Sequence, residues 1–413
     1  MSLKNIQLVL LLLALSACAN NTPVNINHKT SSPQADSTGV GLTAKLLPQN
    51  NKVLLIIGQD LSSVKDYVES AYFPAPGGIT TYISFYSLLR ETFPAYGALG
   101  QDVDGKTFTN NVDWGAGPLS AHSAALSFPG ASLVIGLNIA EGDASTAWAA
   151  GGLADIGVGA YDANIRRLAR FCKSIDKPVY LRIGYEFDGA WNRGYEKHAS
   201  YIYAYRRIVD VMRAQGVTNV AYVWQASASP VDDIVEGRHE NIMDWYPGDE
   251  YVDWMGLSWF LAPASVQQSA PDQASLANEV TSFARRQSKP VMIAEAAPQG
   301  FDLTQMTKSN ISVLLDGAAG SDRISVTPAL IWDTWFAPFF NYIHTNADVI
   351  RAVAYINADW NSQTKWSTPY NEGYWGDSRL QHNPVIRQRW LQEIGDSTFW
   401  LHGSPDLKQQ LMD

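Results

Sequence analysis

Two glutamates follow apolar segments that have the composition of buried strands. Glu186 comes shortly after Val179–Ile183, and Glu295 comes directly after Pro290–Ala294. If both segments are parallel strands of one barrel, their carboxyl ends meet at the face where barrel enzymes carry their active sites. Two carboxylates converging there can cleave a glycosidic bond, because one can protonate the leaving oxygen while the other attacks the anomeric carbon. A single strand-end glutamate is weak evidence, whereas two of them form a much more specific pattern.

The rest of the chain predicts the elements that would position these glutamates. Eight apolar runs are spaced along it: Val53–Ile57, Ile79–Phe85, Leu133–Ile139, Val179–Ile183, Val220–Trp224, Trp254–Trp259, Val291–Ala294 and Val353–Ile356. Between several of them, apolar residues recur at helical spacing, as in Tyr161–Ile175, Ile202–Met212 and Leu276–Phe283. Apolar strands separated by helices indicate a buried parallel sheet. Eight such strands predict an α/β fold consisting of a single (β/α)8 barrel.

Composition narrows the range of partners. The formal net charge of −10 repels phosphate backbones, which argues against nucleic acid. The chain has 14 Trp and 19 Tyr, and 14 Trp are more than a core of this size needs. Flat aromatic rings in a cleft can stack on the apolar faces of sugars, so we expect a polysaccharide or oligosaccharide as the partner. The seven His are scattered without a spacing suited to zinc, and we expect neither a metal nor another cofactor.

Residues near the strand ends are candidates for binding that sugar chain. Arg182 is the nearest cation in sequence to favour an ionised Glu295, and Tyr185 could donate a hydrogen bond to Glu295 or to a sugar hydroxyl. Five tryptophans are expected at or just after strand ends, two or three of them in contact with substrate: Trp191, Trp224, Trp259, Trp332 and Trp360. The candidates for hydrogen bonds to sugar hydroxyls are Asp188, Asn192, Gln225 and Asp333.

The pattern resembles glycoside hydrolase family 26 and its relatives among the clan A barrels. The resemblance is carried by Arg182, Glu186, Gly189, Trp191 and the segment Lys289–Glu295, and it extends loosely over Val53–Trp390. It implies that Glu186 is the acid/base and Glu295 the nucleophile of a retaining, double-displacement mechanism. In that mechanism Glu186 must be protonated at working pH, so its pKa should be raised.

The chain departs from the family pattern in three places. Tyr185 stands where the family has His, Phe187 and Asp188 stand where the family has Met-Asn before the shared Gly189, and Trp259 stands where the family tends to place Tyr. These positions should contact the nucleophile and the sugar hydroxyls, so a mannan substrate does not follow from the resemblance. We expect an endo-acting hydrolase of β-mannan, β-1,3-xylan or a galactan of the agar or carrageenan kind.

Two other functions stay open at this point. One is a non-catalytic glycan-binding surface lipoprotein built on the same barrel, and the other is a transglycosylase. The pair formed by Glu186 and Glu295 favours an enzyme over a binding protein, because binding alone does not need both carboxylates.

The N-terminal residues predict export and lipid anchoring. Lys4 precedes the apolar run Leu8–Leu15, which is too short for a membrane span of about 20 residues and suits a signal peptide. Leu15–Cys18 resembles a bacterial lipobox, whose cysteine becomes acylated. We therefore predict a lipoprotein signal peptide over residues 1–18 with Cys18 as the lipidation site, a disordered tether over 19–45 and a catalytic domain over 46–413.

This organisation places an exported bacterial lipoprotein at the outer membrane, in the periplasm or at the cell surface. It would contact the membrane only through its N-terminal lipid, and we expect a monomer. The remaining cysteine, Cys172, falls on the apolar face of a predicted helix, so we expect a small buried side chain rather than a nucleophile.

Overall fold

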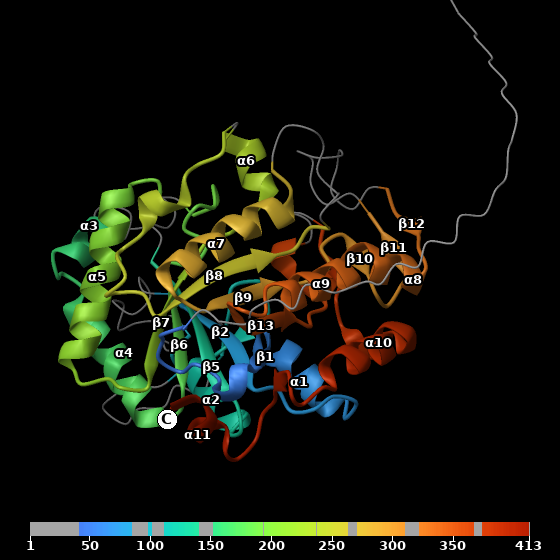
Figure 1. Ribbon diagram of the computed structural model, residues 1–413, viewed down its shortest axis with the longest axis horizontal. Helices are drawn as coiled ribbons and strands as arrows, with labels where there is room; N and C mark the ends of the chain where they lie inside the picture. The colour runs from blue at the N-terminus through green and yellow to red at the C-terminus, as the bar shows by residue number, and fades with distance from the viewer. Residues whose placement is uncertain are drawn as a thin grey trace, which may run out of the picture. The chain divides into compact units, whose positions relative to one another are not determined.

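Eight parallel strands close into a ring in the computed structural model (Figure 1). In ring order they are β1 (Val53–Gly58), β2 (Gly78–Ser84), β5 (Ser132–Asn138), β6 (Val179–Ile183), β7 (Val220–Gln225), β8 (Trp254–Trp259), β9 (Val291–Ala296) and β13 (Ile350–Ile356). The ring closes because β13 also pairs with β1 in parallel register. The predicted (β/α)8 barrel and all eight predicted strands are therefore confirmed.

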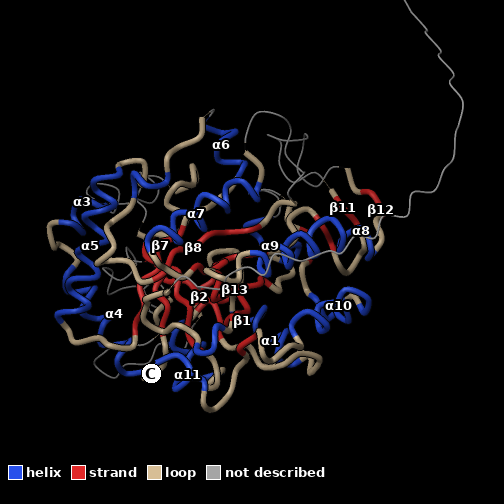
Figure 2. Tube along the Cα trace, in the orientation of Figure 1, coloured by secondary structure: helices blue, strands red, loops and turns tan. Residues whose placement is uncertain are grey.

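The structure describes residues 41–84, 98–100, 111–139, 152–192, 194–236, 238–262, 271–309, 322–366 and 374–412. Helices surround the strands within these ranges, as the tube in Figure 2 shows. They are α1 (Leu61–Glu69), α2 (Ala121–Ser127), α3 (Gly152–Gly157), α4 (Asp162–Ile175), α5 (His198–Ala214), α6 (Pro230–Glu236), α7 (Gln273–Gln287), α8 (Pro328–Ile331), α9 (Ala337–Thr345), α10 (Pro384–Ile394) and α11 (Leu407–Met412). The three predicted helices correspond to α4, α5 and α7. Within the described part of the chain, no helix is both long and apolar enough to span a membrane.

Short strands and turns complete the structure outside the ring. β15 (Trp400–Leu401) pairs with the start of β1, and β3 (Val112–Asp113) pairs with β4 (Pro118–Leu119). A small separate sheet contains β10 (Phe301–Asp302), β11 (Thr307–Lys308), β12 (Ile324–Ser325) and β14 (Gly376–Asp377). Short 3-10 turns occur at Gln49–Asn51, Ile242–Trp245, Trp360–Ser362, Thr364–Trp366 and Leu380–His382, and a π-helical turn spans Trp332–Phe336.

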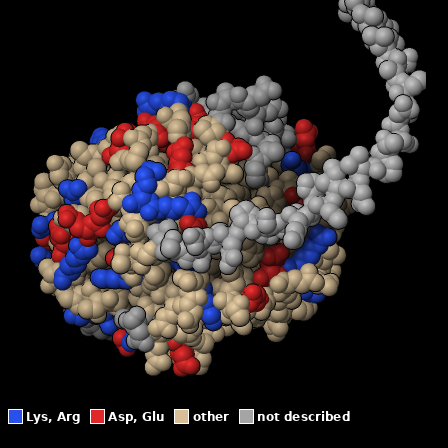
Figure 3. Space-filling model, viewed as in Figure 1, with Lys and Arg blue, Asp and Glu red and all other residues tan. Residues whose placement is uncertain are grey.

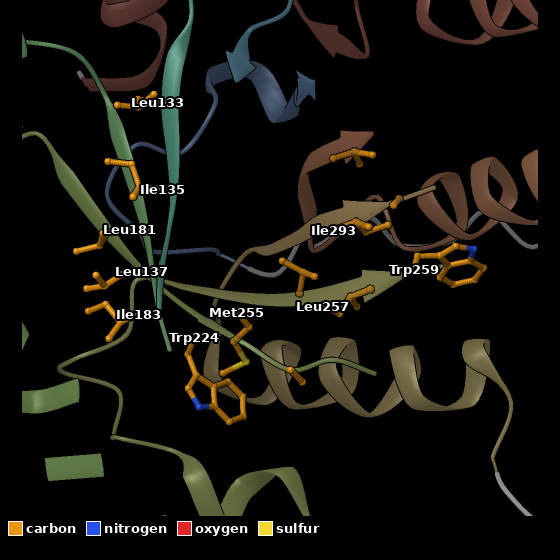
Figure 4. Close-up of a cluster of buried hydrophobic side chains, with 14 of the residues drawn as sticks. Leu133, Ile135, Leu137, Leu181, Ile183, Trp224, Met255, Leu257, Trp259 and Ile293 are labelled. Carbon is orange, nitrogen blue, oxygen red and sulfur yellow. The ribbon is translucent and has the colours of Figure 1, made fainter. Parts of the chain in front are cut away.

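The strands bury both faces, and the two faces have different partners. Alternate residues such as Leu54, Ile56 and Val223 fill the interior of the barrel. Their neighbours in sequence point outward to the helices and form the larger core. Figure 4 shows part of that outer cluster, with Leu181, Trp224 and other side chains on the outside of the strands. A strand residue therefore reaches the interior and the site above it only at every second position.

The end of the predicted tether is part of the packed domain. The backbone N–H of Thr43 donates to the carbonyl of Ser288 at 3.1 Å. The indole N–H of Trp254 donates to the Lys45 carbonyl at 2.8 Å, and the Tyr180 hydroxyl donates to the Leu46 carbonyl at 2.6 Å. The boundary predicted after residue 45 is therefore a few residues too late, because these backbone groups satisfy side chains of the barrel floor. The signal peptide, Cys18 and the tether up to residue 40 lie outside the described residues.

Two further sequence features can be located. Cys172 is completely buried in α4, where burial raises the pKa of its thiol to about 12, as expected for a packing residue. The surface view in Figure 3 shows Lys and Arg interspersed with Asp and Glu on a largely uncharged face. That appearance agrees with the low content of charged residues, 17%.

Candidate active site

Glu295 reaches the barrel interior because β9 contains an irregularity. Ile293 pairs with Leu257 of β8, but the next pair joins Glu295 to Ser258, so β9 has one extra residue at this point. Ala294 faces the interior, and regular alternation would therefore turn Glu295 outward to the helices. The extra residue shifts the alternation by one, as β-bulges do, and directs the carboxylate inward.

Glu186 lies in the loop after β6, where its backbone adopts a left-handed conformation with φ of 52°. Such a conformation is costly for a non-glycine residue and persists only where neighbours fix it. Here the side-chain amide of Asn192 donates to the Glu186 carbonyl at 2.7 Å, and the backbone N–H of Gly189 donates to the same oxygen at 3.0 Å. Asn192 therefore positions the loop rather than binding a sugar hydroxyl through its amide group.

Arg182 forms an ion pair with Glu295. One guanidinium nitrogen of Arg182 lies 2.6 Å from Glu295 Oε1, and the arginine side chain is fully buried in the barrel. The rings of Tyr82 and Tyr185 cover its guanidinium with centroids at 5.0 and 5.2 Å. A buried charge of this kind needs a close partner of opposite sign, and Glu295 supplies it. Arg182 thus has the expected relation to Glu295, and Tyr185 reaches the carboxylate pair by packing on Arg182.

A chain of buried polar groups links the two glutamates. The same nitrogen of Arg182 donates to Gln225 Oε1 at 2.9 Å, and Gln225 Nε2 donates to the Ser258 hydroxyl at 3.1 Å. Ser258 in turn donates to Glu186 Oε1 at 2.7 Å. Gln225, expected to bind a sugar hydroxyl, is completely buried and serves this chain instead.

The two glutamates have different electrostatic environments. Burial, and then the negative charge of Glu295, raise the pKa of Glu186 to about 8, although hydrogen bonds from Ser258 and Trp191 oppose this shift. A carboxyl group with this pKa is protonated at neutral pH and can act as a general acid. The arrangement therefore has one protonated and one ion-paired carboxyl group, the pair of states that a retaining glycoside hydrolase needs.

Trp191 is the one tryptophan of the predicted five that presents an exposed ring. Trp191 is 50% exposed, and its indole N–H donates to Glu186 Oε2 at 3.0 Å. An exposed ring fixed directly on the acid/base candidate is suitably placed to contact a sugar bound at Glu186.

The prediction of sugar-stacking surfaces is wrong for the other four tryptophans. Trp224 and Trp259 are buried because they occupy outward-facing positions of β7 and β8, where Trp224 stacks on Phe187 and Trp259 packs on Tyr342. Trp360 is buried too, and its indole N–H donates to Ser378 at 2.9 Å.

Trp332 and Asp333 belong to a helical segment rather than to a strand end. Trp332 is in the π-helical turn between α8 and α9 and stacks on Phe336. Asp333 is exposed and pairs with Arg389 of α10 at 3.7 Å. Thr327 caps the start of this helix and Pro328 occupies its first position, a pair of residues that is typical of a helix start.

Asp188 also has a different task from the one expected. Its carboxylate accepts the backbone N–H of Ser227, which follows β7, and burial raises its pKa to about 6. Asp232 of α6 similarly accepts the backbone N–H of Ala190. Both aspartates therefore hold the loop that carries Glu186 against the neighbouring strand and helix.

Several residues of the site were not predicted from the sequence. Ser258 and Tyr82 lie inside predicted strands, and only their interior-facing positions could have singled them out. Trp366 and Trp375 are partly buried and pack with Trp360 at centroid distances of 5.5 and 4.7 Å. They adjoin a small cluster at the ends of β9 and β13, which makes them further aromatic candidates at the mouth of the barrel.

A (β/α)8 barrel with these two carboxyl groups at the ends of its fourth and seventh strands has the architecture of a retaining glycoside hydrolase. Comparison with known proteins indicates the same class of enzyme. The model of "Glycosyl hydrolase family 26" matches residues 160–303, a range that contains both glutamates. A β-1,3-xylanase of Alcaligenes sp is 36% identical over 365 residues, which are 88% of this chain and 67% of that protein. A β-1,3-xylanase of Vibrio sp is 36% identical over 373 residues, 90% of this chain and 70% of that protein.

Solved structures support the fold. A family 26 β-mannanase from Bacteroides ovatus superposes with a TM-score of 0.53 at 15% identity, covering 88% of this chain and 93% of the mannanase. The chain therefore belongs to glycoside hydrolase family 26, and it is an endo-acting, retaining glycoside hydrolase. The non-catalytic binding function considered from the sequence is set aside by this membership.

Proposed function

We propose that this enzyme hydrolyses β-1,3-xylan, with Glu186 as acid/base and Glu295 as nucleophile. The observation that carries the catalytic assignment is the unequal environment of the two glutamates. Glu295 is paired with the buried Arg182 at 2.6 Å, whereas burial and the Glu295 charge hold the pKa of Glu186 at about 8. The substrate assignment rests on the two β-1,3-xylanases, which align with 88% and 90% of the chain.

The geometry suits both halves of a double displacement. In the first half, ionised Glu295 attacks the anomeric carbon while Glu186 gives its proton to the departing sugar oxygen. The new ester removes the negative charge of Glu295, and that charge is one of the causes that raise the pKa of Glu186. The pKa of Glu186 then falls, so the ionised group can act as the base that activates water in the second half.

Among the described residues around the two glutamates, the charge distribution favours a neutral polymer over a sulfated one. Binding sulfate groups would require cations that are free to face the substrate. Arg182, the cation that the sequence associated with Glu295, is buried and its guanidinium is bound to Glu295 and Gln225. A neutral xylan or mannan fits this arrangement better than a carrageenan does, and the relatives favour the xylan.

The test is a product profile on a panel of polysaccharides. Purified enzyme is incubated with β-1,3-xylan, β-1,4-xylan, β-1,4-mannan, agarose and carrageenan, and Glu295→Gln serves as the control for contaminating activities. We expect a ladder of β-1,3-linked xylooligosaccharides and little release from the other polymers. Preferential cleavage of mannan or of a galactan would overturn the substrate assignment while leaving the catalytic residues to be tested separately.

We also propose that the enzyme is an exported lipoprotein acylated at Cys18. This proposal rests on the short apolar run Leu8–Leu15 and the Leu-Ser-Ala-Cys sequence that ends it. Location at the cell envelope would place the enzyme where a polymer too large to enter the cell can be cleaved.

A further inference from the structure

The polar chain that ends on Glu186 has a fixed direction. It starts at Arg182, whose guanidinium can only donate hydrogen bonds. Gln225 must therefore present its carbonyl oxygen to Arg182, and its NH2 group then faces the Ser258 hydroxyl at 3.1 Å. An NH2 group also only donates, so Ser258 accepts from Gln225 and its own single proton is directed to Glu186 Oε1 at 2.7 Å.

Burial prevents this direction from being reversed by solvent. Arg182, Gln225 and Ser258 are all at least 98% inaccessible, so no solvent molecule competes for their donors and acceptors. If the Ser258 hydroxyl accepted a proton from Glu186 instead, its own proton would face the Gln225 NH2 group. That arrangement leaves a buried donor without an acceptor, which is unfavourable.

We propose that Gln225 and Ser258 are positioning residues that hold the transferable proton of Glu186 on Oε2. The proposal rests on the assignment of Glu186 as the acid/base. In a protonated carboxyl group the carbonyl oxygen is the better acceptor, so the directed bond from Ser258 makes Oε1 the carbonyl oxygen. The proton is then carried by Oε2, the oxygen beside the exposed side chain of Trp191.

Trp191 also donates to Oε2, but it is held less firmly than Ser258. The two bonds, 3.0 Å from Trp191 and 2.7 Å from Ser258, each have the ordinary length for their kind of donor, whereas Trp191 is half exposed and Ser258 is buried. A sugar arriving at Glu186 can displace an exposed indole more easily than a buried hydroxyl that is held at both ends. Oε2 is therefore the oxygen from which a proton can reach the substrate.

Besides burial, four neighbouring groups act on the pKa of Glu186. Glu295 from β9 and Asp188 from the same loop both raise the pKa of Glu186, and Ser258 and Trp191 both lower it. Removing either donor should therefore raise that pKa, but only the loss of Ser258 should release the proton from Oε2. The position of the proton therefore distinguishes a specific role of Ser258 from a general effect of hydrogen-bond donors on the pKa of Glu186.

Neutron diffraction on the deuterium-exchanged, substrate-free enzyme tests the proposal directly. At a pD well below the Glu186 pKa of about 8, we expect the deuteron on Oε2 in the parent and in Ser258→Thr, which keeps the hydroxyl. Ser258→Ala should show it shared between both oxygens, whereas Trp191→Phe should keep it on Oε2. A deuteron on Oε1 of the parent would overturn the proposal.

A solution titration provides a second readout that does not require turnover. The ionisation of Glu186 can be followed by carbon NMR of labelled glutamate, with Glu186→Gln identifying its signal. Ser258→Ala should shift this titration upward by roughly half to one pH unit, the scale of one hydrogen bond, and Ser258→Thr should restore it. An unchanged titration in Ser258→Ala would contradict the proposal. Because neither experiment uses catalysis, failure of the acid/base assignment would appear separately, as full activity of Glu186→Gln.

Discussion

Ser258 and Glu295 lie opposite each other on β8 and β9, directly after the point where β9 contains one extra residue. Ser258 donates to Glu186, and Glu295 accepts from Arg182, so this one strand pair contacts both ends of the site. The irregularity brings the nucleophile candidate into the barrel. The central claim is that Glu186 is the acid/base and Glu295 the nucleophile, because the two side chains have different surroundings.

Replacing the nucleophile candidate should remove activity but not the fold. We expect Glu295→Gln to lower kcat by about 10³-fold or more, because no other group can form the covalent intermediate. Circular dichroism and thermal unfolding should show a folded protein, since the amide can still accept from Arg182. Activity within tenfold of the parent would remove Glu295 from the mechanism.

Replacing the acid/base candidate should give a selective defect. Glu186→Ala should lose most activity on polymer, whose leaving group needs a proton, and retain more on aryl glycosides with good leaving groups. Azide should restore turnover of such substrates and give a β-glycosyl azide, because attack on the intermediate then needs no base. An α-azide product, identified by NMR, would indicate inversion and contradict the retaining scheme.

The pKa of Glu186 predicts how activity and stability depend on pH. Since the acid must be protonated, kcat/KM should fall as the pH rises through about 8. For stability, the folded-state pKa lies above the ordinary value of 4.5, so the folded chain binds this proton more tightly than the unfolded chain does. The resulting stabilisation is complete below the unfolded pKa and is lost as the pH rises to about 8.

Glu186→Gln separates this contribution from all others, because it cannot ionise. The stability advantage of Glu186→Gln over the parent, measured by denaturant unfolding, should therefore increase between pH 5 and about pH 8. Glu196→Gln, a change on the same loop outside the carboxylate pair, is a suitable control. Equal pH dependence of Glu186→Gln and the parent would show that Glu186 is not perturbed in this way.

The N-terminal boundary can be tested by truncation. A chain that starts at Val40 should fold and keep full activity. A chain that starts at Pro48 loses the carbonyl partners of Trp254 and Tyr180, and each buried donor left unpaired costs about 1–3 kcal/mol. We expect a lower Tm for the shorter chain, measured by scanning calorimetry, and equal Tm values would mean that the segment 40–47 does not stabilise the barrel.

Export and lipid anchoring can be tested by labelling and fractionating bacteria that express the full-length chain. Cys18→Ser in the full-length chain should abolish incorporation of labelled fatty acid and move the enzyme from the membrane fraction to the soluble fraction. The parent and Cys172→Ser, which alters only a buried cysteine, should both remain labelled. Labelling of Cys18→Ser would show that the anchor assignment is wrong.

The barrel could be predicted because its strands are apolar on both faces. Such runs are distinctive, and the polar residues that follow them lie at one end of the barrel. The direction of individual side chains was harder to predict. Trp224 and Trp259 occupy outward positions and are buried under helices, and Trp332 belongs to a helix. Glu295 points inward only because of an irregularity that depends on pairing with β8, and a single sequence does not contain that pairing.

The positioning residues could not be predicted from the sequence either, and the reason is physical. Ser258 is one small polar residue inside an apolar run, and its importance comes from partners on β7 and in the loop after β6 that are distant in sequence. Arg182 was associated with Glu295 as the nearest cation in sequence to the strand-end glutamates, and the structure pairs the two side chains at 2.6 Å.

The most direct test of the central claim is to trap the covalent intermediate. An activated 2-deoxy-2-fluoro β-1,3-xylobioside should inactivate the enzyme and remain attached, because the fluorine slows the second step more than the first. Peptide mass spectrometry should then locate the sugar on Glu295, with no adduct in Glu295→Gln. A sugar attached to Glu186 or to any other residue would contradict the account.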